Sequence, residues 1–299
     1  MPTKTMSAGQ WSQLVLVAAI WGTSFFLIEI ALRDLGPFTL VFYRLLLAAA
    51  VSVAVLYLNG ARLPLDGASW RRFFMLGAFN TSIPFMLISS GQVYINSSQA
   101  SILNATVPVF TVLMAHFLTK DEKMTRQRLA GVLVSLAGVC LLVGPDAFAG
   151  LSSSFLGQAA VLGGAMSYAY AGVYARRFDE IPILQAMAGT LVAASLLSIP
   201  FAFIFEYPLV TDLSPATMGA IVFMALLATA FSYLVYFHVI RTAGATNTLL
   251  VVFLVPVTAI LLGVIFLGES INARMTCAVF IVFSGLILVD GRLLRRMMK

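Results

Sequence analysis

Charged residues are scarce in this chain of 299 residues: they make up 10%, against 61% hydrophobic residues, and the mean hydropathy is +0.99. A soluble domain has about 25% charged residues, so the composition excludes a protein whose surface faces mainly water. Only two cysteines are present, Cys140 and Cys277, both inside apolar runs and without CxxC spacing. We expect them to be small buried hydrophobic residues, with no disulfide and no metal site.

Catalytic signatures are also missing. The sequence has no HExxH motif, no GxSG motif with a helical histidine, no paired aspartates and no P-loop. An intramembrane enzyme would need a nucleophile with its base, or metal ligands at helical spacing, so we predict no enzyme, no catalytic residue, no metal and no cofactor. The net charge of +6 does not indicate nucleic acid, because the basic residues form short clusters and no continuous stripe.

Long apolar runs dominate the chain. A helix that crosses a hydrocarbon core of about 30 Å needs about 20 mostly apolar residues. The first run is expected to be a spanning helix and not a removed signal peptide. Ten segments qualify: Trp11–Leu32, Phe38–Leu58, Arg72–Gly91, Ser98–Leu118, Leu129–Gly144, Phe155–Tyr174, Ile183–Phe205, Ala216–Phe237, Thr246–Phe266 and Met275–Val289. The interruptions are too short for a soluble domain, so residues 1–299 are predicted to form a single all-α transmembrane domain.

Lysine and arginine alternate between the connections. Of the 18 basic residues, 15 lie in the odd-numbered non-spanning pieces, two (Arg33 and Arg274) lie in the even-numbered ones, and Arg44 lies inside a helix. Cytoplasmic loops carry the excess of Lys and Arg. The alternation therefore predicts ten spans in the inner (plasma) membrane, with both termini in the cytoplasm.

The chain repeats itself at about half its length. Pro108 and Pro256 lie 148 residues apart, and Gly138 and Gly285 lie 147 apart, as do Glu122 and Glu269. This divides the chain into one repeat at about 11–144 and a second at about 155–290. Each has five helices, an odd number, so the second must enter the membrane inverted. Inverted repeats of this kind are typical of transporters.

Three motifs carry a resemblance to a known family. They are Trp21-Gly22-Thr23-Ser24-Phe25, Tyr43-Arg44-Leu45-Leu46-Leu47-Ala48-Ala49, and the Pro256 helix that runs into Leu267-Gly268-Glu269. In this order and spacing the chain resembles the EamA-type branch of the drug/metabolite transporter superfamily over essentially its whole length. It also looks like the YddG-type aromatic amino-acid exporters within it. The resemblance implies ten helices around a central cavity and export of small metabolites. Ser167-Tyr168-Ala169-Tyr170 departs from the pattern, since a Trp is common there.

Polar and aromatic residues in mid-helix are the candidates for the substrate path. Unpaired amides and hydroxyls are costly in hydrocarbon, so these side chains should face inward. Helix–helix hydrogen bonding is the alternative role for any one of them. The predicted cavity residues are Trp21, Ser24, Phe25, Arg44, Asn80, Ser82, Gln99, Asn104, Tyr168, Ser232, Tyr233 and Asn247.

Two prolines and one carboxylate are the candidates for gating. Pro108 and Pro256 lie near the middle of their helices and should kink them, since proline lacks an N–H and clashes with the carbonyl four residues earlier. The kinks are either hinges or fixed packing features. Glu29 and Arg44 lie at similar depth in an antiparallel hairpin, so we expect them to pair or to share one polar pocket. The pair would be either structural or part of a gate.

These observations predict a secondary transporter that works by alternating access and exports small metabolites, with amino acids that are aromatic or otherwise hydrophobic as the first candidates. The alternatives are an exporter of amphipathic cations, drugs or nucleosides with the same fold, and a channel, although no filter-like loop or charge ring is visible. The predicted partners are the small-molecule substrate and the lipid bilayer, without nucleic acid. The protein is expected to be a monomer or a weak homodimer.

Overall fold

The computed structural model describes residues 6–119, 123–144, 152–175, 181–207, 209–243 and 251–290. All regular structure in these ranges is helical. The first half of the chain contains α1 (Ala8–Ala31), α2 (Pro37–Leu58), α3 (Gly67–Gly77), the π-helical segment η1 (Ala78–Ser82), α4 (Ile83–Gln92), α5 (Ser97–Asn104), α6 (Val107–Leu118) and α7 (Arg126–Val143).

The second half follows the same order. It contains α8 (Ser153–Ala175), α9 (Ile183–Phe205), α10 (Pro215–Phe223), the π-helical segment η3 (Met224–Phe231), α11 (Ser232–Ala243), α13 (Val251–Leu267) and α14 (Ala273–Asp290). Because η1 runs directly between α3 and α4, these three form one rod from Gly67 to Gln92, and η3 joins α10 to α11 in the same way.

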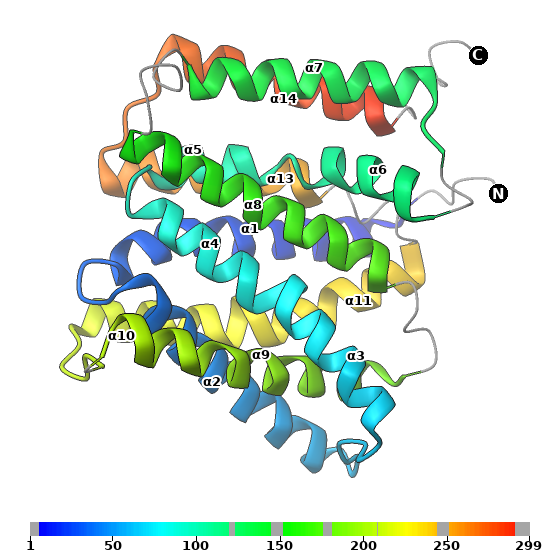
Figure 1. Cartoon of the computed structure of the whole chain (residues 1–299), viewed down its shortest axis with the longest axis vertical. Helices are drawn as coiled ribbons and strands as arrows, with labels where there is room; N and C mark the ends of the chain where they lie inside the picture. The colour runs from blue at the N-terminus through cyan, green and yellow to red at the C-terminus, as the bar shows by residue number, and fades with distance from the viewer. Residues whose placement is uncertain are drawn as a thin grey trace.

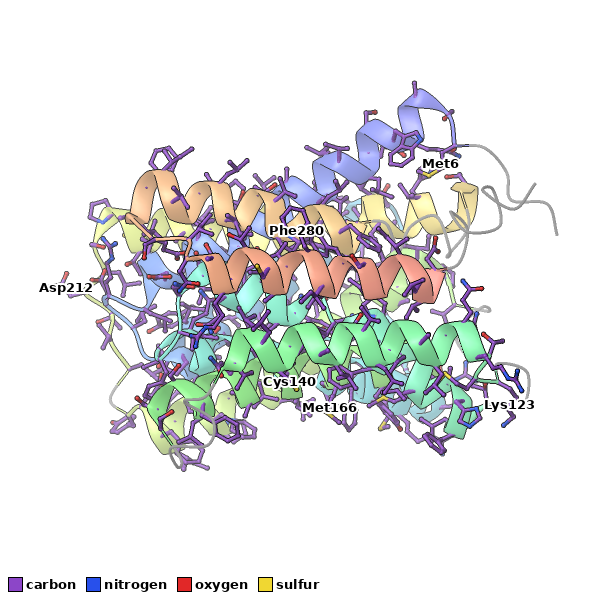
Figure 2. The ribbon with its side chains drawn as sticks, turned by 90° about the horizontal axis from the view of Figure 1, so that it is seen from above. Met6, Lys123, Cys140, Met166, Asp212 and Phe280 are labelled. Atoms are coloured by element: carbon purple, nitrogen blue, oxygen red, sulfur yellow. The ribbon has the colours of Figure 1, made fainter. Side chains whose placement is uncertain are left out.

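The helices form a bundle whose connections lie at its two ends (Figures 1 and 2). Met6 and Lys123 lie at one end and Asp212 at the other, and we call these the Met6 end and the Asp212 end. The connections α1–α2, α4–α5, α9–α10 and α13–α14 all lie at the Asp212 end, on the left of Figure 1. Helices of the two halves pack against each other throughout, with α2 on α9, α1 on α13 and α4 on α8.

Eight of the helical rods are long and apolar enough to cross a membrane. They coincide with eight of the ten segments predicted from hydropathy. The remaining two coincide with α13, which is apolar but has 17 residues, and with α8, which has 23 residues and is less apolar. Outward-facing Phe280, Ile265, Phe266 and Leu58, between 66 and 86% exposed, suit contact with lipid tails and not with water.

Helices α7 and α14 form a separate layer of the bundle, at the top of Figure 1. They run antiparallel, and small residues bring their backbones together. A Cβ added to Gly131 would lie 2.6 Å from the carbonyl oxygen of Gly285, and one on Gly138 would lie 3.1 Å from that of Ala278. These two contacts exchange under a shift of 147 residues. The sequence places the small residues Gly131, Ser135 and Gly138 on one face of α7, a pattern that predicts close helix packing, and these contacts confirm it.

The prediction that Cys140 and Cys277 are buried is wrong. Both thiols are exposed, on the outer faces of α7 and α14. A thiol is nearly apolar, so it is as well suited to a lipid-facing surface as to a buried core. Hydropathy alone does not separate these two places.

The glycine contact between α7 and α14 predicts a stability effect. Gly285→Ala should destabilise the protein by about 1–3 kcal/mol, because the new methyl group has no space. Gly219→Ala in α10 is the matched control, since nothing lies within 4 Å of an added Cβ there, and helix propensity should make it neutral or stabilising by up to about 1 kcal/mol. The measurement is denaturant unfolding in detergent. Equal effects of the two changes would contradict the packing argument.

Candidate functional site

The two π-helical segments occupy equivalent places in the two halves. The first begins at Ala78 and the second at Met224, 146 residues later. In a π-turn the hydrogen bonds run from residue i to i+5, which widens the helix and disturbs the regular pairing of its carbonyl groups. Such segments occur often at functional sites. Neither was predicted from the sequence.

A side chain from the opposite half binds a carbonyl in each π segment. The Ser167 hydroxyl of α8 donates to the Phe79 carbonyl in η1 at 2.8 Å, and the Trp21 indole N–H of α1 donates to the Ala228 carbonyl in η3 at 3.1 Å. Position 21 plus 147 is Tyr168, the neighbour of Ser167. The missing second tryptophan is therefore replaced in this role by the adjacent serine.

Arg44 of α2 lies beside η3 and is 4% exposed. Its Nε donates to the Thr229 hydroxyl at 3.0 Å, and its Nη1 lies 3.9 Å from the Met224 sulfur. Its guanidinium carbon lies 3.9 Å from the centre of the Phe85 ring, a cation–π contact. Arg44 is thus fully enclosed in the middle of the bundle with neutral neighbours.

Tyrosine and asparagine complete this region. The Asn80 amide of η1 donates to the Tyr233 hydroxyl at 3.3 Å, and that hydroxyl lies 3.3 Å from the Asn80 carbonyl. Tyr168 and Tyr233 pack against the same buried core as Phe85, and the Trp21 ring lies 5.1 Å from that of Tyr236. We call Trp21, Arg44, Asn80, Ser167, Thr229 and Tyr233 the central cluster.

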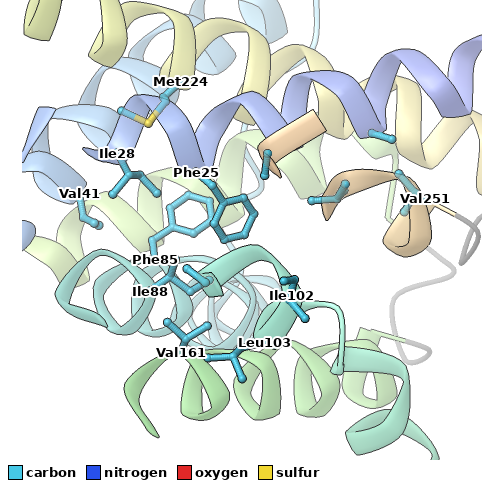
Figure 3. Packing of buried hydrophobic residues seen from close by; sticks show 14 of the residues in the cluster. Phe25, Ile28, Val41, Phe85, Ile88, Ile102, Leu103, Val161, Met224 and Val251 are labelled. Atoms are coloured by element: carbon cyan, nitrogen blue, oxygen red, sulfur yellow. The ribbon is translucent and has the colours of Figure 1, made fainter. Parts of the chain in front are cut away.

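The structure thus brings together four predicted cavity residues (Trp21, Arg44, Asn80 and Tyr233), with Tyr168 near Arg44. Others have different partners: Ser82 donates to the Ala194 carbonyl of α9, Ser232 donates to the Leu227 carbonyl in η3, and the Gln99 backbone N–H donates to the Asn96 side chain. The Phe25 ring points into the packed interior near Phe85 (Figure 3). Asn247 lies outside the described residues.

In the described residues six buried side-chain oxygens lack a hydrogen-bond partner, and they include the Ser24 hydroxyl of α1, the Gln92 Oε1 of α4 and the Asn104 Oδ1 of α5. The Gln92 amide nitrogen is used, since it donates to the Phe25 carbonyl at 2.8 Å. An unpaired acceptor in a membrane interior is costly. Ser24 and Asn104 were predicted to face the substrate path, and Gln92 is a residue that the sequence analysis missed.

Glu29 and Arg44 do not pair, so this prediction is wrong. Glu29 accepts a hydrogen bond from the Ser97 backbone N–H at 3.0 Å, at the Asp212 end, whereas Arg44 contacts Thr229, Met224 and Phe85. The position of a residue along the hairpin fixes its depth in the membrane but not the direction in which its side chain leaves the helix. Glu29 points toward α5, and Arg44 points toward η3.

Pro108 produces a complete break and not a kink within a helix. Helix α5 ends at Asn104 and α6 begins at Val107, so Pro108 lies in the first turn of α6, where a missing N–H costs nothing. The Thr106 hydroxyl donates to the Leu103 carbonyl at 2.6 Å and so satisfies one of the carbonyl groups at the end of α5. Pro256 lies inside α13.

Three carboxylates join the two halves at the Asp212 end, each at a helix N-terminus. Glu206 accepts from the Phe38 and Thr39 backbone N–H groups of α2 at 3.0 and 2.7 Å. Glu269 accepts from the Ser97 and Ser98 backbone N–H groups of α5 at 2.9 and 3.1 Å, and from both serine hydroxyls. The third is Asp34, described next. Negative charge is stabilised at a helix N-terminus.

Asp34 accepts from the Ser214 backbone N–H, at the N-cap of α10, at 3.0 Å, and from the Ser214 hydroxyl. Hydrogen bonds from the hydroxyls of Ser214 and Thr217 hold the pKa of Asp34 below its usual value. We call Asp34, Glu206 and Glu269 the acidic seam. In the part of the chain that the structure describes, no three His, Cys, Asp or Glu side chains are grouped as metal ligands would be.

One cavity of about 440 Å³ lies between α6 and α8 and is entirely apolar. Its lining includes Phe110, Leu113, Met114, Phe117 and Met166. It lies apart from the central cluster, where buried side chains such as Phe25, Phe85 and Met224 fill the space (Figure 3). Arg44 is therefore closed off from the surface in this structure.

Comparison with known proteins identifies the family. A model of the EamA-like transporter family matches residues 11–144 and again residues 155–290. The chain belongs to the EamA-like transporter family. It therefore contains two EamA repeats, and it is a multi-pass membrane protein of a family of transporters, which are generally not enzymes.

Relatives cover nearly the whole chain. The uncharacterized transporter YoaV of Bacillus subtilis is 23% identical over 91% of this chain and 94% of its own length. An uncharacterized transporter of Archaeoglobus fulgidus is 28% identical over 93% and 94%, and the uncharacterized inner membrane transporter YedA of Escherichia coli is 26% identical over 90% and 87%. A solved crystal structure at 21% identity has a TM-score of 0.69 and covers 98% of this chain and 100% of its own, which shows the same fold.

The hydrogen bond from Trp21 to η3 predicts a difference between two tryptophans. Trp21→Phe leaves the Ala228 carbonyl unpaired inside the bundle and should destabilise the protein by about 1–3 kcal/mol. Trp70→Phe removes a similar bond, to the Pro64 carbonyl at 2.9 Å, at the Met6 end, where water can replace it; the loss should stay below about 1 kcal/mol. Unfolding in detergent measures both. Equal losses would show that η3 does not depend on Trp21.

Proposed function

We propose that this protein is a secondary transporter that exports small metabolites, with hydrophobic amino acids as its main substrates, by alternating access. In this proposal ten helices cross the inner membrane as two inverted five-helix halves, and both termini lie in the cytoplasm. The Met6 end is then cytoplasmic, and the Asp212 end faces outward. The excess of basic residues in the connections of the Met6 end supports this orientation.

The reciprocal hydrogen bonds of the π segments carry the proposal. One side chain of each half donates a hydrogen bond to the π segment of the other half: Ser167 of α8 donates to η1, and Trp21 of α1 donates to η3. Two conformations that open to opposite sides need two similar structural units arranged symmetrically. The exchange of the α7–α14 contacts under a 147-residue shift supports the same symmetry.

The acidic seam is the proposed outer gate. It joins the two halves at the Asp212 end by hydrogen bonds from helix N-termini to carboxylates. Such bonds can break without opening a hydrophobic core. Glu29 shares the Ser97 N–H with Glu269 and so links α1 to the same gate. The break before Pro108 and the proline inside α13 provide places where the helices can bend as the gate opens.

An exporter of amphipathic cations or nucleosides with the same fold is the second candidate. The central cluster favours the export of hydrophobic amino acids over this second candidate, because the one formal charge of the cluster is positive. YddG-type specificity for aromatic amino acids is a narrower form of the same proposal, and the aromatic side chains around Arg44 are what supports it. A monomer or a weak homodimer suffices, since each central-cluster residue comes from one chain.

Counterflow into proteoliposomes tests the proposal. Purified protein is reconstituted and loaded with a panel of unlabelled amino acids, nucleosides and quaternary amines, with and without a pH gradient. We expect labelled hydrophobic amino acids to accumulate in exchange for internal ones. If no small solute exchanges, the exporter proposal fails. If only quaternary amines exchange, the second candidate replaces it.

The acidic seam predicts that loss of the Glu269 charge increases the solvent accessibility of position 95. Glu269→Gln removes the charge that binds the N-terminus of α5 and should loosen the outer gate. A cysteine at Ile95, which is 6% exposed, would then react several-fold faster with a membrane-impermeant thiol reagent, in a background where Cys140 and Cys277 are serine.

Asp212→Asn is the matched control, because Asp212 is an exposed carboxylate at the same end outside the acidic seam. It should leave the labelling rate unchanged. Unchanged labelling in Glu269→Gln as well, with normal thermal stability, would show that Glu269 does not hold the gate.

A further inference from the structure

We propose that Arg44 binds the carboxylate of the transported molecule, so that the substrates of this protein are organic acids, including zwitterionic amino acids, with an apolar side chain. This inference rests on the proposed function and names the chemical group by which the substrate is recognised. It follows from the charge, the free donors and the surroundings of one buried side chain.

The charge of Arg44 has no counter-ion in the described structure. Its neighbours are a hydroxyl, a thioether and an aromatic ring. Acidic residues of the described ranges have other partners: Glu29 accepts from the Ser97 N–H, and the acidic seam binds helix N-termini at the Asp212 end. A buried charge without a counter-ion costs several kcal/mol. A protein that needed only packing here would be more stable with a neutral residue.

Among the described residues the guanidinium also has N–H groups without a hydrogen-bond acceptor. Thr229 takes the Nε–H, and the contact of Nη1 is a sulfur at 3.9 Å, which is a weak acceptor. The Nη edge therefore remains available. Its two parallel N–H groups match the two oxygens of a carboxylate, and such bidentate pairs are the strong form of this interaction.

The surroundings suit the rest of an apolar amino acid. Phe85 covers one face of the guanidinium, and Tyr168 and Tyr233 pack against the same buried core. These rings can contact an apolar side chain. The Tyr233 hydroxyl and the Asn80 carbonyl are neutral acceptors for an ammonium group, whereas a cation without a carboxylate would meet the repulsion of Arg44 with no acid to balance it.

The position of Arg44 links recognition to movement. Thr229 and Met224 both lie in η3, and the Thr229 hydroxyl donates to the Met224 carbonyl at 2.8 Å. A carboxylate on the Nη edge of Arg44 would compete with the Met224 sulfur for Nη1, next to the hydrogen bond between Nε and the Thr229 hydroxyl. Binding would therefore alter the contact between α2 and η3, the segment that Trp21 holds from the other half.

The experiment compares substrates that differ at one group. Counterflow of labelled L-phenylalanine is measured in the presence of 3-phenylpropionate, which lacks the amine, or L-phenylalanine amide, which lacks the carboxylate. In the wild-type protein we expect 3-phenylpropionate to compete and the amide to compete at least tenfold more weakly. Equal competition by the two would overturn the inference without any variant.

Variants then assign the effect to Arg44. Arg44→Gln should weaken the binding of phenylalanine at least tenfold and abolish the preference for 3-phenylpropionate over the amide. Arg44→Lys should keep part of the binding and part of the preference. Arg33→Gln, an arginine at the Asp212 end, is the control and should leave both unchanged. A preference for the carboxylate that survives in folded Arg44→Gln would overturn the inference.

The outcomes separate this inference from the proposed function. A wild-type protein that exchanges no solute removes the proposed function and this inference with it. A protein that exchanges solutes regardless of whether they carry a carboxylate keeps the exporter function but removes the role of Arg44. If Arg44→Gln does not fold, the wild-type comparison and Arg44→Lys still decide the question.

Discussion

The structure depends on one constraint: inside a bilayer no water is available to satisfy a backbone carbonyl. Two π-helical segments disturb the regular pairing at the centre of the molecule, and each therefore needs a donor from another helix. Trp21 and Ser167 supply these donors across the boundary between the halves. The position of α1 against η3, and of α8 against η1, follows from this need. Thr229 and Tyr233 supply further donors, to the Met224 and Asn80 carbonyls of the two π segments.

The same constraint explains why the two kinds of polar site differ. At the Asp212 end the carboxylates are near water, and helix N-termini provide donors that can be released and bound again. In the centre, release of a hydrogen bond exposes a group to hydrocarbon unless a substrate or water takes its place. The polar centre should therefore change its partners only when the bundle admits such a molecule. This gives a physical reason for coupling between substrate binding and helix movement.

Much of the fold could be predicted from the sequence. Long apolar runs located the helices, and the spacing of Gly131, Ser135 and Gly138 located the α7 packing surface, because both depend on composition along one helix. The π segments could not be predicted, since no residue type marks a change from i+4 to i+5 pairing. The partners of Arg44 and Glu29 were missed for a related reason: depth in the membrane follows from counting residues, whereas the facing direction depends on the packing of distant helices.

The pairing of α7 with α14 has a consequence for how the chain is made. The small-residue face of α7 is covered by α14, the last helix in the described chain, more than 120 residues later. While the ribosome is still producing the second half, this face has no partner and must stay next to lipid, to the insertion machinery or to another nascent helix. The layer closes only after α14 has been made. Loss of the last helix would therefore expose a surface made in the first half of the chain, and quality control could detect an unfinished protein there.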